Sequence, residues 1–102
     1  MTEHNLSDLS ERWMSVEPDR EDEYRSELRR ECPAGHTLHD VDVDPVAIRR
    51  LLKEIVYWVP DRRLWAWVHL TWTVETDPNL PRTELFADWG DLVKALREAD
   101  RG

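Results

Sequence analysis

The sequence has little of several residue types on which common sites and architectures depend. A single cysteine, Cys32, excludes an internal disulfide and is typical of a reducing cytoplasm, where we place this chain. Three glycines leave neither a glycine-rich phosphate loop nor a nucleophile elbow. No apolar run approaches the roughly 20 residues of a membrane span, and residues 1–10 lack the pattern of a secretion signal. We therefore expect neither membrane insertion nor secretion.

Basic residues are also scarce relative to acidic ones. Lys and Arg number 14 against 22 Asp and Glu, which gives a formal net charge of -8 and argues against nucleic acid as a partner. Residues 1–44 hold 13 acidic and 5 basic residues, whereas residues 45–102 hold nine of each. The N-terminal excess is either a solvated face or a surface that attracts a basic partner. Asp22 and Glu23 are our binding candidates for the second interpretation.

The length and composition predict one small α+β domain. A chain of 102 residues with 40% hydrophobic content is long enough to bury a core without metal or disulfide support. We expect an acidic helical part over residues 1–34. A central antiparallel β-hairpin with a third strand, followed by an amphipathic C-terminal helix, is expected over residues 35–102.

Three helices are predicted before the hairpin, the first and the third of them short. Ser7 is a cap for a helix over residues 8–14, and Pro18 begins a second helix that ends near residue 31. A mostly extended connector follows. The pair Asp44-Pro45 then resembles a helix start and predicts a short helix over residues 46–52.

The second helix has a narrow apolar stripe. Tyr24 and Leu28 recur at the i, i+4 spacing of one helix face. Charged residues fill the remaining positions, and Glu27 is among those that we assign to the solvated face. Such a helix is expected to pack at the edge of a core.

The strongest local signal is a β-hairpin in the middle of the chain. Residues 54–59 and 64–73 are rich in aromatic and β-branched side chains, and residues 60–63 separate them as a turn. Counting outward from a four-residue loop predicts these opposite pairs: Val59 with Leu64, Trp58 with Trp65, Val56 with Trp67, and Glu54 with His69. Both faces of this hairpin are then mostly apolar.

The end of the chain predicts a strand and a helix. Asp77 to Pro81 form a loop, and residues 83–86 return as the third strand. From Asp88 onward, apolar residues fall at helical spacing, so this helix is expected to lay one face on the sheet: Trp89, Leu92, Val93 and Leu96.

Tryptophan is unusually frequent, with six in the chain, and three of them share one hairpin face: Trp58, Trp65 and Trp67. That face needs a cover. In the first interpretation, the N-terminal helices cover it with these side chains: Trp13, Met14, Tyr24 and Leu28. In the second, the face is a binding surface for a basic protein or for a second copy of the chain, because tryptophan is enriched at interface hot spots. A homodimer through the hairpin edge is a further alternative.

Two segments of the second half carry a resemblance to a known family. Residues 68–72 read Val-His-Leu-Thr-Trp, and residues 81–89 follow the pattern Pro-x-Thr-Glu-Leu-Phe-x-x-Trp. Together with Gly35-His36 and Leu38, they resemble a family of small uncharacterised bacterial proteins of about this length. The chain departs from that family over residues 51–57. The resemblance implies one compact domain and no established activity.

Two groups of residues offer chemistry. Cys32, His36 and His39 are ligand types that zinc accepts, but they lack the paired knuckles of structural zinc sites, so we expect no metal or other cofactor. Glu54 is predicted opposite His69, with Thr71 on the same face, so a carboxylate could orient an imidazole for general-base work. No motif adds a nucleophile or an oxyanion cradle.

The sequence therefore favours a non-enzymatic acidic interaction module, such as an inhibitor or immunity-type protein for a basic partner. Two alternatives stay open. One is a small enzyme or ligand-binding protein that uses His69, Glu54 and Thr71, and the other is a homodimeric structural protein.

Overall fold

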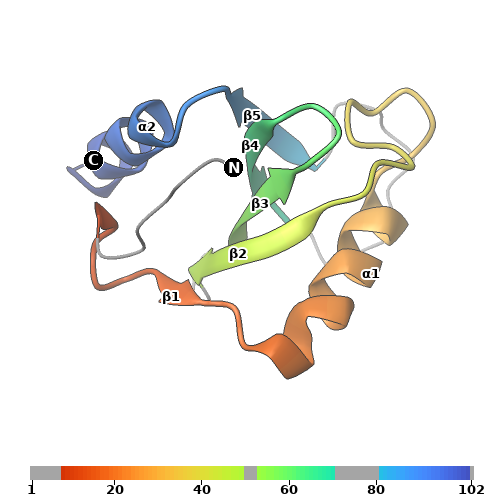
Figure 1. Cartoon of the computed structure of the whole chain (residues 1–102), viewed down its shortest axis with the longest axis horizontal. Coiled ribbons are helices and arrows are strands. Elements are labelled where there is room, and N and C mark those ends of the chain that lie inside the picture. The colour runs from red at the N-terminus through yellow and green to blue at the C-terminus, as the bar shows by residue number, and fades with distance from the viewer. Residues whose placement is uncertain (1–7, 50–52, 71–80, 102) are drawn as a thin grey trace.

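The chain forms a five-stranded antiparallel sheet with one helix on each face (Figure 1). The computed structural model describes residues 8–49, 53–70 and 81–101. The elements in chain order are β1 (Met14–Ser15), the 3-10 turn η2 (Pro18–Arg20), α1 (Glu21–Glu31), β2 (Asp44–Arg49), β3 (Glu54–Val59), β4 (Leu64–His69), β5 (Arg82–Phe86) and α2 (Trp89–Arg101). The sheet order is β1-β2-β3-β4-β5, so each strand pairs with its neighbour in sequence. The α+β class is confirmed, with a larger sheet than predicted.

The central hairpin has the register that the sequence predicts. Glu54 lies opposite His69, and Trp58 lies opposite Trp65. The loop over residues 60–63 is closed by Arg62 N–H, which donates to the Val59 carbonyl at 3.2 Å. The predicted third strand is confirmed as β5, which pairs with β4. The predicted helices over residues 18–31 and from Trp89 onward are confirmed as η2 with α1 and as α2.

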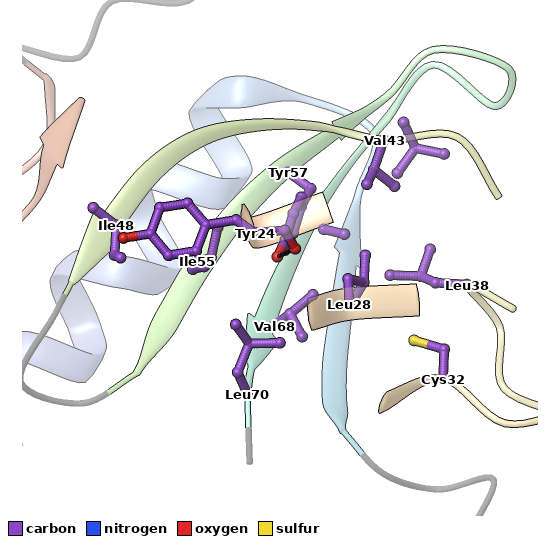
Figure 2. Close-up of a cluster of buried hydrophobic side chains, with 12 residues drawn as sticks. Tyr24, Leu28, Cys32, Leu38, Val43, Ile48, Ile55, Tyr57, Val68 and Leu70 are labelled. Carbon is purple, nitrogen blue, oxygen red and sulfur yellow. Dashed lines mark hydrogen bonds between the residues drawn. The ribbon is translucent and has the colours of Figure 1, made fainter. Parts of the chain in front are cut away.

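Because side chains alternate across the sheet, the two apolar hairpin faces line two separate cores. The first, which we call the α1 core, lies between α1 and one sheet face, where Tyr24 and Leu28 pack against β-strand side chains such as Tyr57 (Figure 2). The second, the α2 core, joins α2 to the tryptophan face: Leu92 and Leu96 pack with Trp65. The three-layer arrangement explains why neither hairpin face is polar.

The predicted helix over residues 46–52 is wrong: residues 44–49 form β2, and residues 50–52 lie outside the described part. Pro45 does not begin a helix but lies at a register irregularity between Pro45 and Ala47, where a strand tolerates proline. Alternation then places Ala47 in the α2 core and Ile48 in the α1 core. Pairing with β3 and burial on both faces outweigh the local capping signal.

The predicted helix over residues 8–14 is also wrong. Ser7, its proposed cap, lies outside the described residues, and the chain beyond it makes turns and then enters β1. Leu9 and Trp13 are both buried in the α2 core, and Met14 pairs with Ile48 of β2. These tertiary contacts stabilise an irregular path, because a helix of this length has little stability of its own.

The cover of the tryptophan face differs from the N-terminal helices that we expected. Tyr24 and Leu28 lie on the opposite side of the sheet, in the α1 core, and Met14 is exposed. The C-terminal helix α2 covers the tryptophan face together with Leu9 and Trp13. The predicted cover by N-terminal helices is therefore wrong: α2 buries Trp65 and Trp67 within the chain, while Trp58 stays half-buried.

The connector between α1 and β2 is a series of turns rather than an extended segment. His36 N–H donates to the Pro33 carbonyl, and His39 N–H donates to the His36 carbonyl, each at 3.0 Å. Gly35 has a φ of 97°, which glycine adopts without strain. Leu38, in this segment, is buried against α1. No helix among the described residues is long and apolar enough to cross a bilayer.

Candidate functional site

Acidic side chains of α1 and of the two segments beside it gather around three arginines. We define the acidic surface by seven carboxylates: Glu17, Asp19, Glu21, Asp22, Glu23, Asp42 and Asp44. Three guanidinium groups lie among them, those of Arg20, Arg25 and Arg29, which leaves a formal excess of four negative charges. Asp22 and Glu23, the two acidic residues among the predicted binding residues, belong to it, and the Asp22 side chain is 98% exposed. The fold thus joins acids that are distant in sequence.

Arg25 organises the centre of the acidic surface. Its guanidinium donates to Asp44 at 2.9 Å, to Asp22 at 3.1 Å and to Glu21 at 3.3 Å, and its Nε donates to the Val43 carbonyl at 3.0 Å. The hydrogen bond to Asp44, more than any other contact, raises the pKa of Arg25. Three carboxylates share one cation here, so the network fixes the carboxylates in place without neutralising them.

The predicted tryptophan surface lies mostly inside the molecule. Trp65 is 1% exposed and Trp67 is 6% exposed, whereas Trp58 is half-buried. Trp65 packs against Trp58 on β3 and Trp89 on α2, with ring centroids 4.7 and 4.8 Å apart. Burial by α2 removes Trp65 and Trp67 from the surface that a partner could reach, so the acidic surface is the larger candidate for binding.

The predicted Glu54–His69 pair lies in a charged row that crosses four strands at one end of the tryptophan face. Arg49 of β2 is opposite Glu54 of β3, which is opposite His69 of β4, which is opposite Arg82 of β5. Glu54 is buried, and its Oε1 accepts a 2.9 Å hydrogen bond from the Trp67 indole N–H. His69 Nδ1 lies 3.5 Å from the same oxygen.

The second oxygen of Glu54 is less well satisfied. Oε2 lies 3.8 Å from Arg49 Nη1, beyond hydrogen-bond distance, and it accepts no hydrogen bond from the described residues. The His69 side chain is 33% exposed. A buried carboxylate therefore faces an imidazole that reaches solvent, which is a geometry for orienting a general base. Thr71, the third predicted member, lies outside the described residues.

The three candidate metal ligands do not converge. His36 Nδ1 accepts from Leu38 N–H at 3.0 Å, and its Nε2 lies 2.8 Å from the Pro81 carbonyl. His39 Nδ1 bonds the carbonyl of Cys32 at 2.9 Å. The Cys32 thiol is buried in the α1 core, and burial raises its pKa to about 12. Within residues 8–49, 53–70 and 81–101, no three His, Cys, Asp or Glu side chains are placed to hold a metal ion.

Sequence reasoning missed a pair of buried carboxyl groups on α1. Glu27, which we assigned to the solvated face, is 5% exposed, and Glu31 is 0% exposed. The signal that could have found them is spacing: with Tyr24 and Leu28 they form one helical stripe of i, i+3, i+4 and i+7. Their charge predicted that both side chains face solvent. Their positions on the helix, in line with Tyr24 and Leu28, place them on the face that packs against the sheet instead.

No family model, no curated protein and no solved structure matches this chain. The resemblance to small bacterial proteins over residues 68–72 and 81–89 therefore stays a prediction. Function has to be argued from the geometry of this molecule alone.

Proposed function

We propose that this chain is a non-enzymatic interaction module that binds a basic protein through the acidic surface. The observation that supports it most is that Asp42 and Asp44 lie beside α1, where they bond Arg29 and Arg25, so that carboxylates from two segments of the chain outnumber the arginines among them. Opposite fields speed the encounter of two proteins and select against acidic partners. An inhibitor or immunity-type protein that masks a basic enzyme is the role we favour.

Because α2 covers the tryptophan face, the proposal is limited to one binding surface. Because Trp65 and Trp67 are buried under α2, the partner contacts the acidic surface rather than an aromatic strip. Affinity then depends strongly on ionic strength, since exposed charge pairs are screened over about 10 Å at 0.1 M salt. A cytoplasmic location, which the single cysteine favours, is part of the same proposal.

A capture experiment with two matched variants tests this proposal. The immobilised chain is exposed to extracts at low and at moderate salt, beside Asp22→Asn/Glu23→Gln and Asp91→Asn/Glu98→Gln. Both double variants remove two exposed carboxylates, the first from α1 and the second from α2. We expect a basic protein that is captured by the native chain and by the α2 variant, and that is lost from the α1 variant. Capture of nothing at either salt concentration would argue against the proposal.

A second function is favoured by the geometry of the charged row. Glu54 Oε1, which accepts the hydrogen bond of the Trp67 indole, lies 3.5 Å from His69 Nδ1, and the His69 side chain is 33% exposed. An imidazole oriented by a buried carboxylate could then act as a base toward a small molecule. Cys32 could serve as a nucleophile, but it lies in the α1 core, on the other side of the sheet. In this alternative, the charged row therefore transfers a proton or binds a ligand and does not form a covalent intermediate.

Chemical modification of His69 distinguishes this alternative from a purely structural role of the charged row. We expect diethylpyrocarbonate to modify His69 several-fold faster in the native chain than in Glu54→Gln, because an oriented imidazole keeps Nε2 available. Peptide mapping resolves His69 from the other histidines. Equal rates in the two proteins would leave Glu54 a purely structural residue. The homodimeric alternative is tested separately by sedimentation over a range of concentrations.

A further inference from the structure

The strand β5 forms one end of the sheet and has an open edge. One of its edges pairs with β4, and no other described strand pairs with β5 (Figure 1). Both edges of the β3–β4 hairpin are paired within the chain, one with β2 and the other with β5. At the opposite end of the sheet, β1 has two residues, whereas β5 has five. Among the described strands, β5 therefore offers the longer open edge.

The hydrogen-bond pattern of the sheet decides which main-chain groups of β5 face outward. Leu70, just after β4, donates its N–H to the Lys53 carbonyl at 2.9 Å, so its main-chain groups face β3. Because these groups alternate along an antiparallel strand, those of the preceding residue, His69, face β5, where they meet Arg82. By the same alternation, the open edge of β5 presents the N–H and C=O groups of two residues: Thr83 and Leu85.

The side chain at the middle of this edge is held within its own chain. Thr83 lies opposite Val68 of the α1 core, and its Oγ1 donates to the Pro81 carbonyl at 3.0 Å and lies 3.4 Å from His36 Nε2. Among the described residues, no turn or loop forms a main-chain hydrogen bond with the outward groups of Thr83 or Leu85. The main chain of this edge is thus open to another strand.

The charges on β5 are complementary to a second copy of β5. Arg82 and Glu84 are both exposed and lie on one face of the strand. Charged side chains protect an edge when they repel an incoming strand, but these two are of opposite sign. An antiparallel copy centred on Thr83 places each Arg82 opposite a Glu84. A copy centred on Glu84 brings two carboxylates together, and one centred on Leu85 places Glu84 opposite Phe86.

Two further features fit this pairing. The Leu85 side chain is 39% exposed, and only Met14 is another exposed large apolar side chain in the described part of the chain. Pairing through β5 brings the beginning of the other copy's strand next to Leu85. The acidic surface lies on α1 and beside β2, away from β5, so the two acidic surfaces of a pair stay apart and open.

We propose that two copies of this chain pair antiparallel through β5, with Thr83 on the two-fold axis, and so join their sheets into one. Thr83 of each copy donates its N–H to the Thr83 carbonyl of the other, and each Arg82 lies opposite a Glu84. Because the edge is short and its charge pairs are exposed, the dimer is weak and reversible. The pairing does not depend on whether the acidic surface binds a basic protein.

Sedimentation of the purified chain from about 10 μM to about 1 mM, at about 0.15 M salt, measures this pairing. We expect a monomer–dimer equilibrium. Glu84→Arg places two arginines opposite each other at both charge pairs, so the dissociation constant should rise about 10-fold or more. Glu98→Arg makes the same change of net charge on the exposed side of α2 and should leave the constant within about two-fold. A native chain that stays monomeric at every concentration would overturn the proposal.

An exchange of charges between copies tests the register. Arg82→Glu places two carboxylates opposite each other at both pairs, so it should weaken the dimer as Glu84→Arg does. An equal mixture of these two variants restores opposite charges at both pairs. We expect mixed dimers at a concentration where each variant alone is mostly monomeric. A mixture that stays monomeric, or a Glu84→Arg chain that dimerises as strongly as the native chain, would contradict pairing centred on Thr83.

Amide hydrogen exchange in the native chain guards against variants that fail to fold. The Glu84 N–H faces β4 and should exchange slowly at every concentration. The Thr83 N–H faces outward, so its exchange should slow several-fold as dimers form between about 10 μM and about 1 mM. A Thr83 N–H that exchanges equally fast at both concentrations would show that β5 is not the contact.

Discussion

His36 joins two distant segments of the chain through both of its ring nitrogens. Leu38 N–H can only donate and the Pro81 carbonyl can only accept, so the ring is the neutral tautomer with its proton on Nε2. The residue is 7% exposed and lies between the turns after α1 and the start of β5. A candidate metal ligand is therefore a structural histidine, bonded in part to neighbouring backbone.

Replacing His36 should cost considerably more stability than replacing His39. His36→Ala leaves the buried Leu38 N–H without its partner and removes one of the two hydrogen bonds to the Pro81 carbonyl, which Thr83 Oγ1 also reaches at 3.0 Å. We therefore expect a loss of about 2 kcal/mol in the free energy of unfolding. His39 is exposed and makes one such bond, so His39→Ala should cost less than about 1 kcal/mol. Urea unfolding measures both. Similar losses in the two variants would contradict this assignment.

At the residue scale, cross-strand neighbours could be predicted and buried charges could not. Counting outward from residues 60–63 placed Glu54 opposite His69 because a four-residue loop fixes the register. The contact of Glu54 with Trp67 was not predicted, since it depends on side-chain rotamers. Glu27 was assigned to solvent because charge usually decides exposure, and here the position on the helix decided it.

At the element scale, α2 is the part that closes the molecule on the tryptophan side. Trp89, at its first turn, donates its indole N–H to Asp8 at 3.0 Å, and Arg97 donates to the Asp8 carbonyl at 2.9 Å. The helix thereby ties the beginning of the described chain to its end. Leu92 is fully buried between α2 and the sheet.

Truncating the buried face of α2 should weaken the whole fold. Leu92→Ala removes a fully buried side chain from the α2 core, so we expect the free energy of unfolding to fall by about 3 kcal/mol. Lys94→Ala, on the exposed side of the same helix, should change it by less than about 0.5 kcal/mol. Thermal and urea unfolding of the two variants check this. A small effect of Leu92→Ala would show that α2 is not an integral cover.

Elements with strong periodicity could be predicted, whereas those held by tertiary contacts could not. α2 and the hairpin follow from spacing alone. The short segments over residues 8–14 and 46–52 carried helix caps, yet the first makes turns into β1 and residues 46–49 of the second belong to β2. In both segments, contacts with the sheet and the α2 core favour these structures. Local capping signals are worth about 1 kcal/mol, which strand pairing and burial exceed.

For the whole molecule, the two cores and the uneven charge have a common consequence. The sheet is covered by α1 on one side and by α2 with Leu9 and Trp13 on the other. Four of the described tryptophans are thereby buried: Trp13, Trp65, Trp67 and Trp89. The outward face of α1 presents the acidic surface. The charge asymmetry could be predicted from the sequence. The helix that covers the tryptophans could not be predicted, because both α1 and α2 have an apolar stripe.

The most direct test of this account is acrylamide quenching of tryptophan emission in Trp72→Phe, followed over a range of concentrations that is also examined by sedimentation. This variant removes the one tryptophan that lies outside the described residues. We predict blue-shifted, weakly quenched emission that does not change with concentration, because α2 covers the tryptophan face within each chain. Red-shifted and strongly quenched emission, or protection that appears only where dimers form, would contradict the account and make the tryptophan face the binding surface.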